Sequence, residues 1–286
     1  MSHRPSSPAT GLPAARKGYS RRDAIPPRLL LALSTGREEP RTLVEWLAID
    51  VPRLLKSVLP EAGLAGLVKE AVAVARRTAP QGVMERHRAI GAFLHQAAEG
   101  PAGRVRVFES LAAHPSGMVR EWAAMMLPAD PSLSIAERIR RARRFAADPS
   151  TIVREIAWVS YRPYLAGNLD EALGLLAGWV RDPDPGVRRC AVESTRPRGV
   201  WCRHLAEMKE EPGRGLPLLE PVRADTSRYV QLSVGNWLND ASKTSPAWTR
   251  RVCRQWRRES PRPETEWIVR HALRTLSRID GSRAGG

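Results

Sequence analysis

The sequence predicts an all-α protein in which helix pairs stack into a solenoid, an α-α superhelix with a basic groove on its concave side. Three observations lead to this fold class. A turn followed by a helix that opens with Val-Arg recurs from residue 100 onward, and apolar residues keep helical spacing before it. The 46 basic and 30 acidic residues leave a net charge of +16. The chain of 286 residues, 42% of them hydrophobic, is also long enough to bury a sizeable core.

The N-terminal 100 residues divide into two parts. Residues 1–40 are expected to form a flexible basic arm, because the stretch up to about Arg28 is rich in Pro, Ser, Ala and Arg and has no hydrophobic period. Residues 41–100 are expected to form a helical bundle that continues into the solenoid as one domain. The i, i+3, i+4 spacing predicts one helix over 42–60, ended by Pro60, and two further helices over 64–78 and 83–98.

Residues 101–280 are expected to form the solenoid itself. The repeating unit is a turn of His, Asp or Ser with Pro, followed by a helix whose first turn carries an anchoring valine and then an arginine. The anchoring valines lie 34, 34, 43 and 39 residues apart: Val119, Val153, Val187, Val230 and Val269. An apolar residue follows each valine four positions later, so this side of the helix faces the hydrophobic layer.

This period and this opening favour HEAT-like repeats. A tetratricopeptide array has a similar period, but its Trp-Leu-Gly-Tyr signature is missing, whereas Asp-Pro followed by Val-Arg is typical of a HEAT repeat. Stacked pairs form a curved solenoid whose second helices line one concave surface. The last residues, 281–286, are expected to form a disordered tail.

The basic composition predicts a polyanionic partner, and we favour nucleic acid. The alternative is that an Arg-rich composition reflects a GC-rich genome. No stretch approaches the roughly 20 apolar residues of a membrane span, and no signal peptide is evident, so we expect a cytoplasmic protein with no membrane partner. The three cysteines lack CxxC spacing, so we expect no disulfide framework, no metal and no cofactor.

The stretch 181–243 carries the candidate site. Positions two, six and ten after each anchoring valine form one stripe on each second helix, which places Glu193 and Asp240 on the same side of adjacent repeats. Trp201 and Trp237 flank them, and an aromatic wall near negative charge is suited to holding a cation, at up to about 2 kcal/mol per indole. The alternative for Glu193 is an ordinary ion pair with Arg189, one turn before it.

A nucleobase alkylated on a ring nitrogen is such a cation. Its glycosidic bond is already weakened, so an enzyme needs mainly to stabilise the developing oxocarbenium ion and to direct a water molecule. A carboxylate performs both tasks, through electrostatics and general base catalysis.

Three stretches resemble the AlkC branch of the HEAT-like alkylpurine DNA glycosylases, which is related to the AlkD branch. They are Arg-Pro-Tyr-Leu at 162–165, the run from Val-Arg-Arg to Glu-Ser-Thr-Arg-Pro-Arg-Gly-Val-Trp at 187–201, and Tyr-Val-Gln-Leu-Ser-Val-Gly-Asn-Trp-Leu-Asn-Asp-Ala-Ser-Lys at 229–243. The resemblance implies base excision repair by a monofunctional glycosylase. Such an enzyme hydrolyses the N-glycosidic bond of cationic N3- or N7-alkylated purines in duplex DNA without a metal.

By motif, the resemblance implies that Asp240 is the catalytic carboxylate, Glu193 a second acidic residue of the site, and Trp201 an aromatic contact to the lesion or its deoxyribose. In one departure, Trp158 stands where the branch has an acidic residue, so we add Trp158 to the substrate-binding set. That set also includes Trp237 and Arg189. The predicted DNA-binding residues are Arg154, Arg188, Arg196, Arg198, Asn236, Asn239 and Lys243.

The expected partner is therefore double-stranded DNA carrying alkylated bases, bound by a monomer in the bacterial nucleoid. Two other classes of protein stay open. A non-catalytic HEAT-like protein that binds damaged or branched DNA would have the same basic groove, whereas a protein-interaction scaffold should have an apolar concave face or one matched to a peptide. Lys243 is the candidate nucleophile for a lyase reaction, but it lies in the motif as a phosphate contact, so we expect no strand cleavage.

Overall fold

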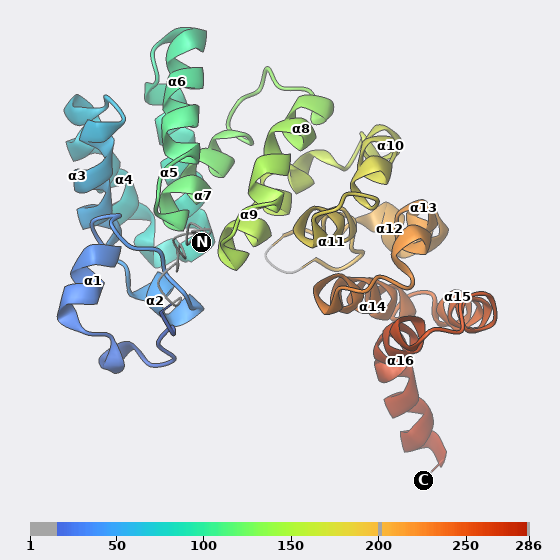
Figure 1. Cartoon of the computed structure of the whole chain (residues 1–286). Coiled ribbons are helices and arrows are strands. Elements are labelled where there is room, and N and C mark those ends of the chain that lie inside the picture. Colours follow the sequence, from blue (N-terminus) through green and yellow to red (C-terminus); the bar gives the residue numbers. More distant parts are fainter. Residues whose placement is uncertain (1–15, 200–201, 285–286) are drawn as a thin grey trace, which may run out of the picture.

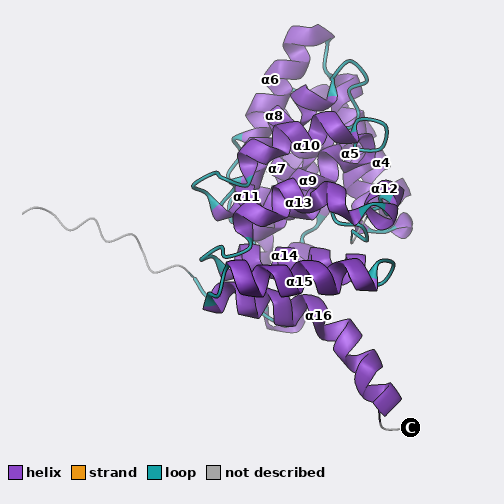
Figure 2. Cartoon of the chain, turned by 90° about the vertical axis from the view of Figure 1, so that its right-hand side faces the viewer, coloured by secondary structure: helices purple, strands orange, loops and turns teal. Residues whose placement is uncertain are grey.

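The computed structural model describes residues 16–199 and 202–284, and every regular element in these ranges is a helix (Figures 1 and 2). The α-helices are α1 (Pro27–Leu33), α2 (Leu43–Ala48), α3 (Val51–Glu61), α4 (Val68–Thr78), α5 (Val83–Ala97), α6 (Gly100–Ala112), α7 (Gly117–Met126), α8 (Ile135–Ala146), α9 (Thr151–Tyr161), α10 (Leu169–Trp179), α11 (Pro185–Ser194), α12 (Ala206–Glu210), α13 (Leu216–Leu219), α14 (Arg228–Ser242), α15 (Pro246–Glu259) and α16 (Pro263–Ala284). The predicted all-α class is confirmed.

From α6 onward the helices, apart from the short α12, form two nested rows (Figure 1). The inner row contains α7, α9, α11, α14 and α16, which are the helices that carry the anchoring valines, and the outer row contains α6, α8, α10, α13 and α15. Each inner helix contacts the next inner helix along the chain. The helix-pair solenoid expected from the repeat is therefore present, and the inner row provides its concave face.

The anchoring valines explain why the pairs stack. All five are 0% exposed, and the residues four positions after the first four of them are also fully buried. Each of the first four turns is closed by a side chain that accepts the backbone N–H two residues later: His114 Nδ1 from Ser116, and the Oδ1 atoms of Asp148, Asp182 and Asp225 from residues 150, 184 and 227. Such local acceptors stabilise the turn that precedes a helix.

The arginine after the anchoring valine joins the repeats. Arg188 donates from Nη1 to the backbone oxygens of residues 182 and 183, at 2.8 and 2.9 Å, and from Nε and Nη2 to Asp225 of the next repeat, at 2.6 and 2.9 Å. Arg120 binds Asp148 in the same way, and Arg154 donates to the oxygen of residue 148 at 2.6 Å and to the Tyr229 hydroxyl. Arg154 and Arg188, which the sequence predicts to bind DNA, hold their own turns in this way, Arg188 also holds the next repeat, and their contact with DNA stays a prediction.

The start of the described chain is part of the fold, so the predicted arm over 1–40 is wrong for residues 16–40. Helix α1 buries Leu33 completely. Arg16 pairs with Glu45 at 2.6 and 2.8 Å, and the backbone N–H groups of Tyr19 and Arg41 also donate to that carboxylate. Residues 1–15 lie outside the described ranges.

Two other boundaries differ from the prediction. The single helix expected over 42–60 is divided into α2 and α3, because Asp50 leaves the helical conformation and its side chain accepts the N–H of Arg53 at 3.0 Å as the cap of α3. At the other end, α16 continues to Ala284, so the tail expected over 281–286 is helical for its first four residues. Within the described part, no helix combines the length and the apolar character that crossing a membrane demands.

Candidate active site on the concave face

Glu193 and Asp240 come together at the C-terminal ends of two adjacent inner helices, α11 and α14. Their side chains are 4% and 5% exposed. Arg196, in the turn after α11, joins them: its Nε and Nη2 lie 3.0 and 2.8 Å from Asp240 Oδ2, and its Nη1 lies 3.0 Å from Glu193 Oε2. The stripe pattern of the sequence therefore places both carboxylates on one side, and a shared guanidinium holds them there.

The remaining carboxylate oxygens are also occupied. Lys243 Nζ lies 3.2 Å from Asp240 Oδ1, and the Ser233 hydroxyl donates to Glu193 Oε1 at 2.6 Å. Burial opposes the charge of Arg196, but Glu193 and Asp240 outweigh it, so the pKa of its guanidinium is raised. The five side chains form one network in which charges of opposite sign alternate.

This network continues across α11 to α9 through Arg189. Its Nη1 lies 2.6 Å from Glu155 Oε1 and its Nη2 lies 3.6 Å from Glu193 Oε1, while its guanidinium stacks 4.3 Å from the centre of the Tyr229 ring. Burial disfavours the charge, but the two carboxylates prevail and the pKa of Arg189 is raised. Arg189 is therefore an ion-pair partner of Glu155 and Glu193, in agreement with the alternative that Glu193 forms an ion pair with Arg189.

Glu155 is a member of the network that motif reasoning missed. Its side chain is 32% exposed, which makes it the most accessible of the three carboxylates. The signal was present in the sequence, because Glu155 follows Val153 by two positions and so occupies the same stripe position as Arg189 in the next repeat.

Three predicted contact residues are packing residues instead. Trp158, Trp237 and Asn239 are 1%, 0% and 2% exposed. Trp237 follows Val230 by seven positions and so shares its inward face; its indole donates to Thr195 Oγ1 at 3.2 Å. The indole of Trp158 donates to Glu155 at 3.2 Å. The predicted substrate-binding roles of both tryptophans are corrected on this ground.

Asn239 joins α14 to α16. Its Nδ2 donates to the backbone oxygen of Ala272 at 2.9 Å and to the Thr275 hydroxyl at 3.0 Å. The predicted DNA contact is corrected because the amide is buried between two helices. Trp201 lies outside the described residues.

Of the other predicted DNA-binding residues, Arg196 and Lys243 contact the site carboxylates. Arg196 is 11% and Lys243 is 41% exposed at its side chain, and both touch Asp240. Arg198 and Asn236 are half-buried. Asn236 lies one turn before Asp240 on α14, and its Oδ1 accepts one hydrogen bond from Arg274 and lies within hydrogen-bond distance of His271 Nε2 on α16. None of the sequence motifs indicated this contribution from the last repeat.

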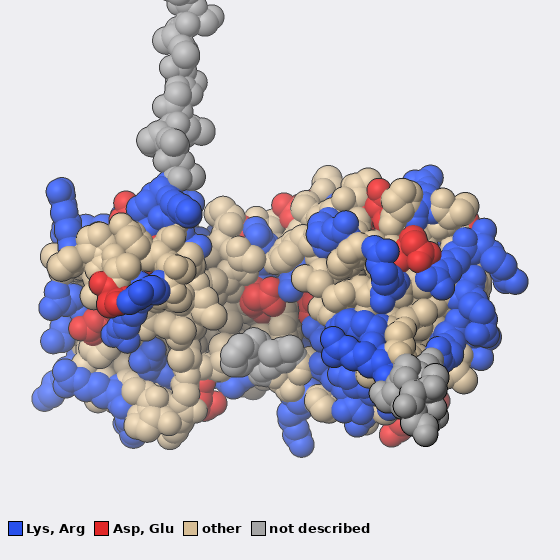
Figure 3. All heavy atoms as spheres, turned by 90° about the horizontal axis from the view of Figure 1, so that it is seen from below, with Lys and Arg blue, Asp and Glu red and all other residues tan. Residues whose placement is uncertain are grey.

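The charge distribution matches a site open toward the concave side. Figure 3 views the molecule from below in Figure 1 and shows Asp and Glu atoms near the middle of that face, with Lys and Arg atoms on both sides. Among the described residues, no cluster of three or more His, Cys, Asp or Glu side chains is arranged to ligate a metal ion.

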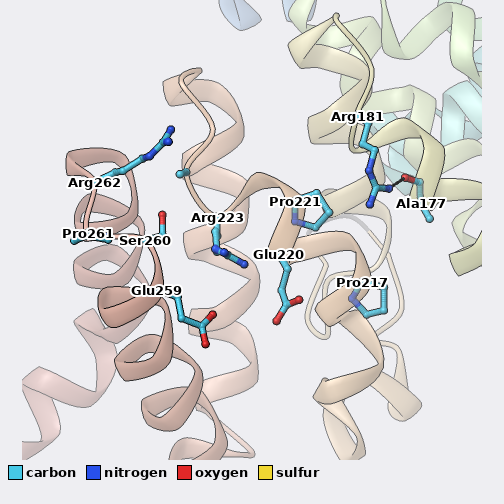
Figure 4. Close-up of a pocket in the computed structure, with 11 residues that line it drawn as sticks. Ala177, Arg181, Pro217, Glu220, Pro221, Arg223, Glu259, Ser260, Pro261 and Arg262 are labelled. Atoms are coloured by element: carbon cyan, nitrogen blue, oxygen red, sulfur yellow. Dashed lines mark hydrogen bonds between the residues drawn. The ribbon is translucent and has the colours of Figure 1, made fainter.

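A separate cavity of about 840 Å³ lies between the ends of outer-row elements (Figure 4). It is lined by residues at and after the end of α10, in and after α13, and from the end of α15 to the start of α16. Arg181 is held there by the backbone oxygen of Ala177 at 2.8 Å. None of the predicted site residues lines this cavity, so the candidate site is distinct from it.

Most of the solenoid matches a known protein family. The family described as "DNA alkylation repair enzyme" matches residues 119–276, which is more than half of the chain and includes both site carboxylates. The uncharacterized protein YhaZ of Bacillus subtilis (strain 168) is 41% identical over 117 residues. That match covers 41% of this chain and 32% of YhaZ, so the chain spans about a third of this relative.

Two solved structures share the fold. The alkylpurine DNA glycosylase AlkC of Pseudomonas fluorescens, bound to DNA containing an abasic site analog, matches with a TM-score of 0.67 and 27% sequence identity over 79% of this chain and 62% of that one. AlkD2 from Streptococcus mutans matches with a TM-score of 0.56 and 18% identity over 71% of this chain and 97% of that one, a likeness of fold alone.

Proposed function

The chain belongs to the DNA alkylation repair enzyme family, and from that premise we propose that it is a DNA glycosylase. Its proposed reaction is metal-free hydrolysis of the N-glycosidic bond of cationic N3- and N7-alkylated purines in duplex DNA. The observation that carries the proposal is the pair of carboxylates at the ends of α11 and α14, joined by Arg196 on the concave face. The likeness to AlkC, a glycosylase solved with DNA, supports it.

Asp240 performs the central step of this mechanism. As the bond between C1′ and the base nitrogen breaks, the base leaves with the bonding electron pair and becomes neutral, and positive charge develops on the deoxyribose. The carboxylate stabilises that charge and accepts a proton from the water that attacks C1′. Because Asp240 is only 5% exposed at its side chain, few waters screen this interaction.

Before DNA binds, Arg196 and Lys243 occupy both oxygens of the Asp240 carboxylate. Arg196 fixes the orientation of the carboxylate through two hydrogen bonds to one oxygen. Lys243 is 41% exposed, so its ammonium group can turn from Asp240 Oδ1 to a backbone phosphate. That exchange would free the oxygen that the reaction uses.

The second candidate is a non-catalytic protein that binds damaged or branched DNA. The observation that favours it is that every oxygen of Glu193 and Asp240 has a cationic or hydroxyl partner, as in a purely structural network. Both candidates predict DNA binding by a monomer, so only the chemistry separates them.

Base release separates the two candidates. Purified protein is incubated with duplex DNA treated with a simple methylating agent, and the released bases are separated by chromatography. Release of 3-methyladenine or 7-methylguanine by the wild type and not by Asp240→Asn supports the glycosylase. Binding of the duplex by both proteins without release from either supports the binding-only candidate. Borohydride treatment should trap no covalent adduct, and a trapped adduct would show that the enzyme is a lyase.

A further inference from the structure

The cationic side chains on the concave face differ in whether a carboxylate compensates their charge. Arg189, Arg196 and Lys243 each form an ion pair with at least one carboxylate. Arg274, on α16, forms none with the described residues, although Asp240 lies near enough to act on its charge. A guanidinium beside a catalytic carboxylate, with its own charge uncompensated by an ion pair, is suited to an anionic ligand.

Two uncharged acceptors hold Arg274 in place. Its Nη2 donates to Asn236 Oδ1 at 2.9 Å, and its Nη1 donates to the backbone oxygen of His271 at 2.6 Å. Burial lowers the pKa of Arg274; the attraction of Asp240 opposes this effect and the repulsion of Arg196 adds to it. A phosphate would relieve this unfavourable environment, since phosphate oxygens accept from a planar guanidinium in a fixed geometry.

Asn236 is oriented by the same contacts. Its Oδ1 accepts from Arg274 and lies 3.0 Å from His271 Nε2, which donates when that nitrogen carries the proton. With the oxygen occupied, the amide NH₂ group points the other way, and no described residue accepts from it. The amide therefore offers a second donor next to Arg274.

Close packing between α14 and α16 keeps this pair rigid. A Cβ atom on Gly235 would lie 2.8 Å from His271 Cδ2, so only glycine admits the imidazole at this distance. The ring of His271 stacks on Trp267, with centroids 4.9 Å apart and planes 9° apart. A site on two packed helices is better preorganised than one on a loop.

We propose that Arg274 and the Asn236 amide form a phosphodiester-binding site that seats the damaged strand beside Asp240. The proposal rests on the proposed function, because it takes DNA as the bound polymer. It assigns a task to the last repeat that the motifs at 187–243 do not include. Binding itself can be measured without base release, so the two proposals can fail separately.

The test is a fluorescence anisotropy titration of a labelled duplex that contains a tetrahydrofuran abasic-site analogue, at four salt concentrations. Arg274→Gln should weaken binding roughly tenfold. It should also reduce the slope of log K against log[salt] by about 0.9, as expected for one lost phosphate contact. Arg262→Gln, an exposed arginine between α15 and α16, loses the same charge away from Asp240 and should weaken binding less than about twofold.

Two further variants guard against a folding defect. Arg274→Lys keeps the charge but cannot hold both acceptors, so its affinity should lie between those of the wild type and Arg274→Gln. Asn236→Ala should weaken binding roughly threefold, and circular dichroism should show all variants folded. If Arg274→Gln binds no more weakly than Arg262→Gln, or keeps the full salt slope, the phosphate site is excluded, whether or not the wild type releases bases.

Discussion

Buried carboxylates near the two ends of the inner row have different partners. Near the N-terminus, Glu121 of α7 is 0% exposed and accepts a hydrogen bond from the Trp46 indole at 2.8 Å, and its other oxygen lies 3.2 Å from His87 Nδ1. Near the C-terminus, Asp240 is almost as buried, but its partners are Arg196 and Lys243. Burial does not distinguish the two carboxylates, whereas the identity of their partners does.

This difference shows how carboxylates on the same helical stripe can serve two purposes. Trp46 and His87 are themselves buried, and no DNA phosphate can compete for them. Lys243 is 41% exposed, so a phosphate can draw it away from Asp240. The N-terminal carboxylate is therefore a structural group, while the C-terminal pair can become available when DNA binds.

Apart from substitutions of Asp240 itself, the largest effect should come from Glu193→Gln. Without the Glu193 charge, Arg189 and Arg196 lose a shared partner, and Arg196 binds Asp240 more tightly. We expect the single-turnover rate of 3-methyladenine release to fall roughly 10³-fold. A comparable fall in Glu121→Gln, measured on folded protein, would remove the distinction between the two regions.

The ion pair between Glu45 and Arg16 should contribute to the free energy of unfolding, and this contribution should depend on pH. Burial alone would raise its pKa, but hydrogen bonds from Arg16 and from the N–H groups of Arg41 and Tyr19 lower the pKa of Glu45 to about 2. An unfolded glutamate has a pKa of about 4.3, so the stabilisation is complete above about pH 5 and is lost as the pH falls toward 2.

Glu45→Gln should accordingly cost on the order of 3 kcal/mol in the free energy of unfolding at pH 7. Urea unfolding of wild type and variant at pH 7 and at pH 3 measures the cost, and the difference should shrink at pH 3. A difference that stays constant between the two pH values would contradict this account. DNA affinity at pH 7 should change little in the folded variant.

Glu121→Gln should destabilise the protein by about 1–3 kcal/mol, because it weakens the buried contacts with Trp46 and His87. The rate of base release should stay within about threefold of the wild type, corresponding to less than about 0.7 kcal/mol. Denaturant unfolding and single-turnover kinetics on the same preparation give both numbers. Loss of activity without loss of stability would move Glu121 into the site.

The smallest effect should come from Lys243→Met. Removing one exposed cation should weaken duplex binding about twofold to fivefold and reduce the salt slope by about 0.9. Base release at saturating protein should persist, because Lys243 is not a nucleophile in this mechanism. Complete loss of release at saturation would instead indicate a chemical role for the amine.

Much of the fold could be predicted from the sequence because its signals are local and repeated. The five anchoring valines, with the partners four residues after the first four of them, encode the buried side of each inner helix directly. The N-terminal errors arose where long-range contacts decide: Arg16 is ordered by Glu45, 29 residues away, and no local period reports such a pair.

The site was predictable where it follows the helical stripe and not where a motif was assigned without geometry. The stripe correctly brings Glu193 and Asp240 together. Trp237 was misassigned because its place in a motif was given more weight than its inward position on α14. The role of Arg188 depends on Asp225, 37 residues later, so it could be recognised only by comparing whole repeats.

The most direct test of the account compares Asp240→Asn with Glu121→Gln. Single-turnover release of 3-methyladenine is measured at protein concentrations that saturate the duplex, so that only the chemical step differs. We predict a loss of roughly 10²–10⁴-fold for Asp240→Asn, with duplex affinity retained, and near wild-type release for folded Glu121→Gln. Release by Asp240→Asn at the wild-type rate would contradict the assignment of the C-terminal pair as the reacting site.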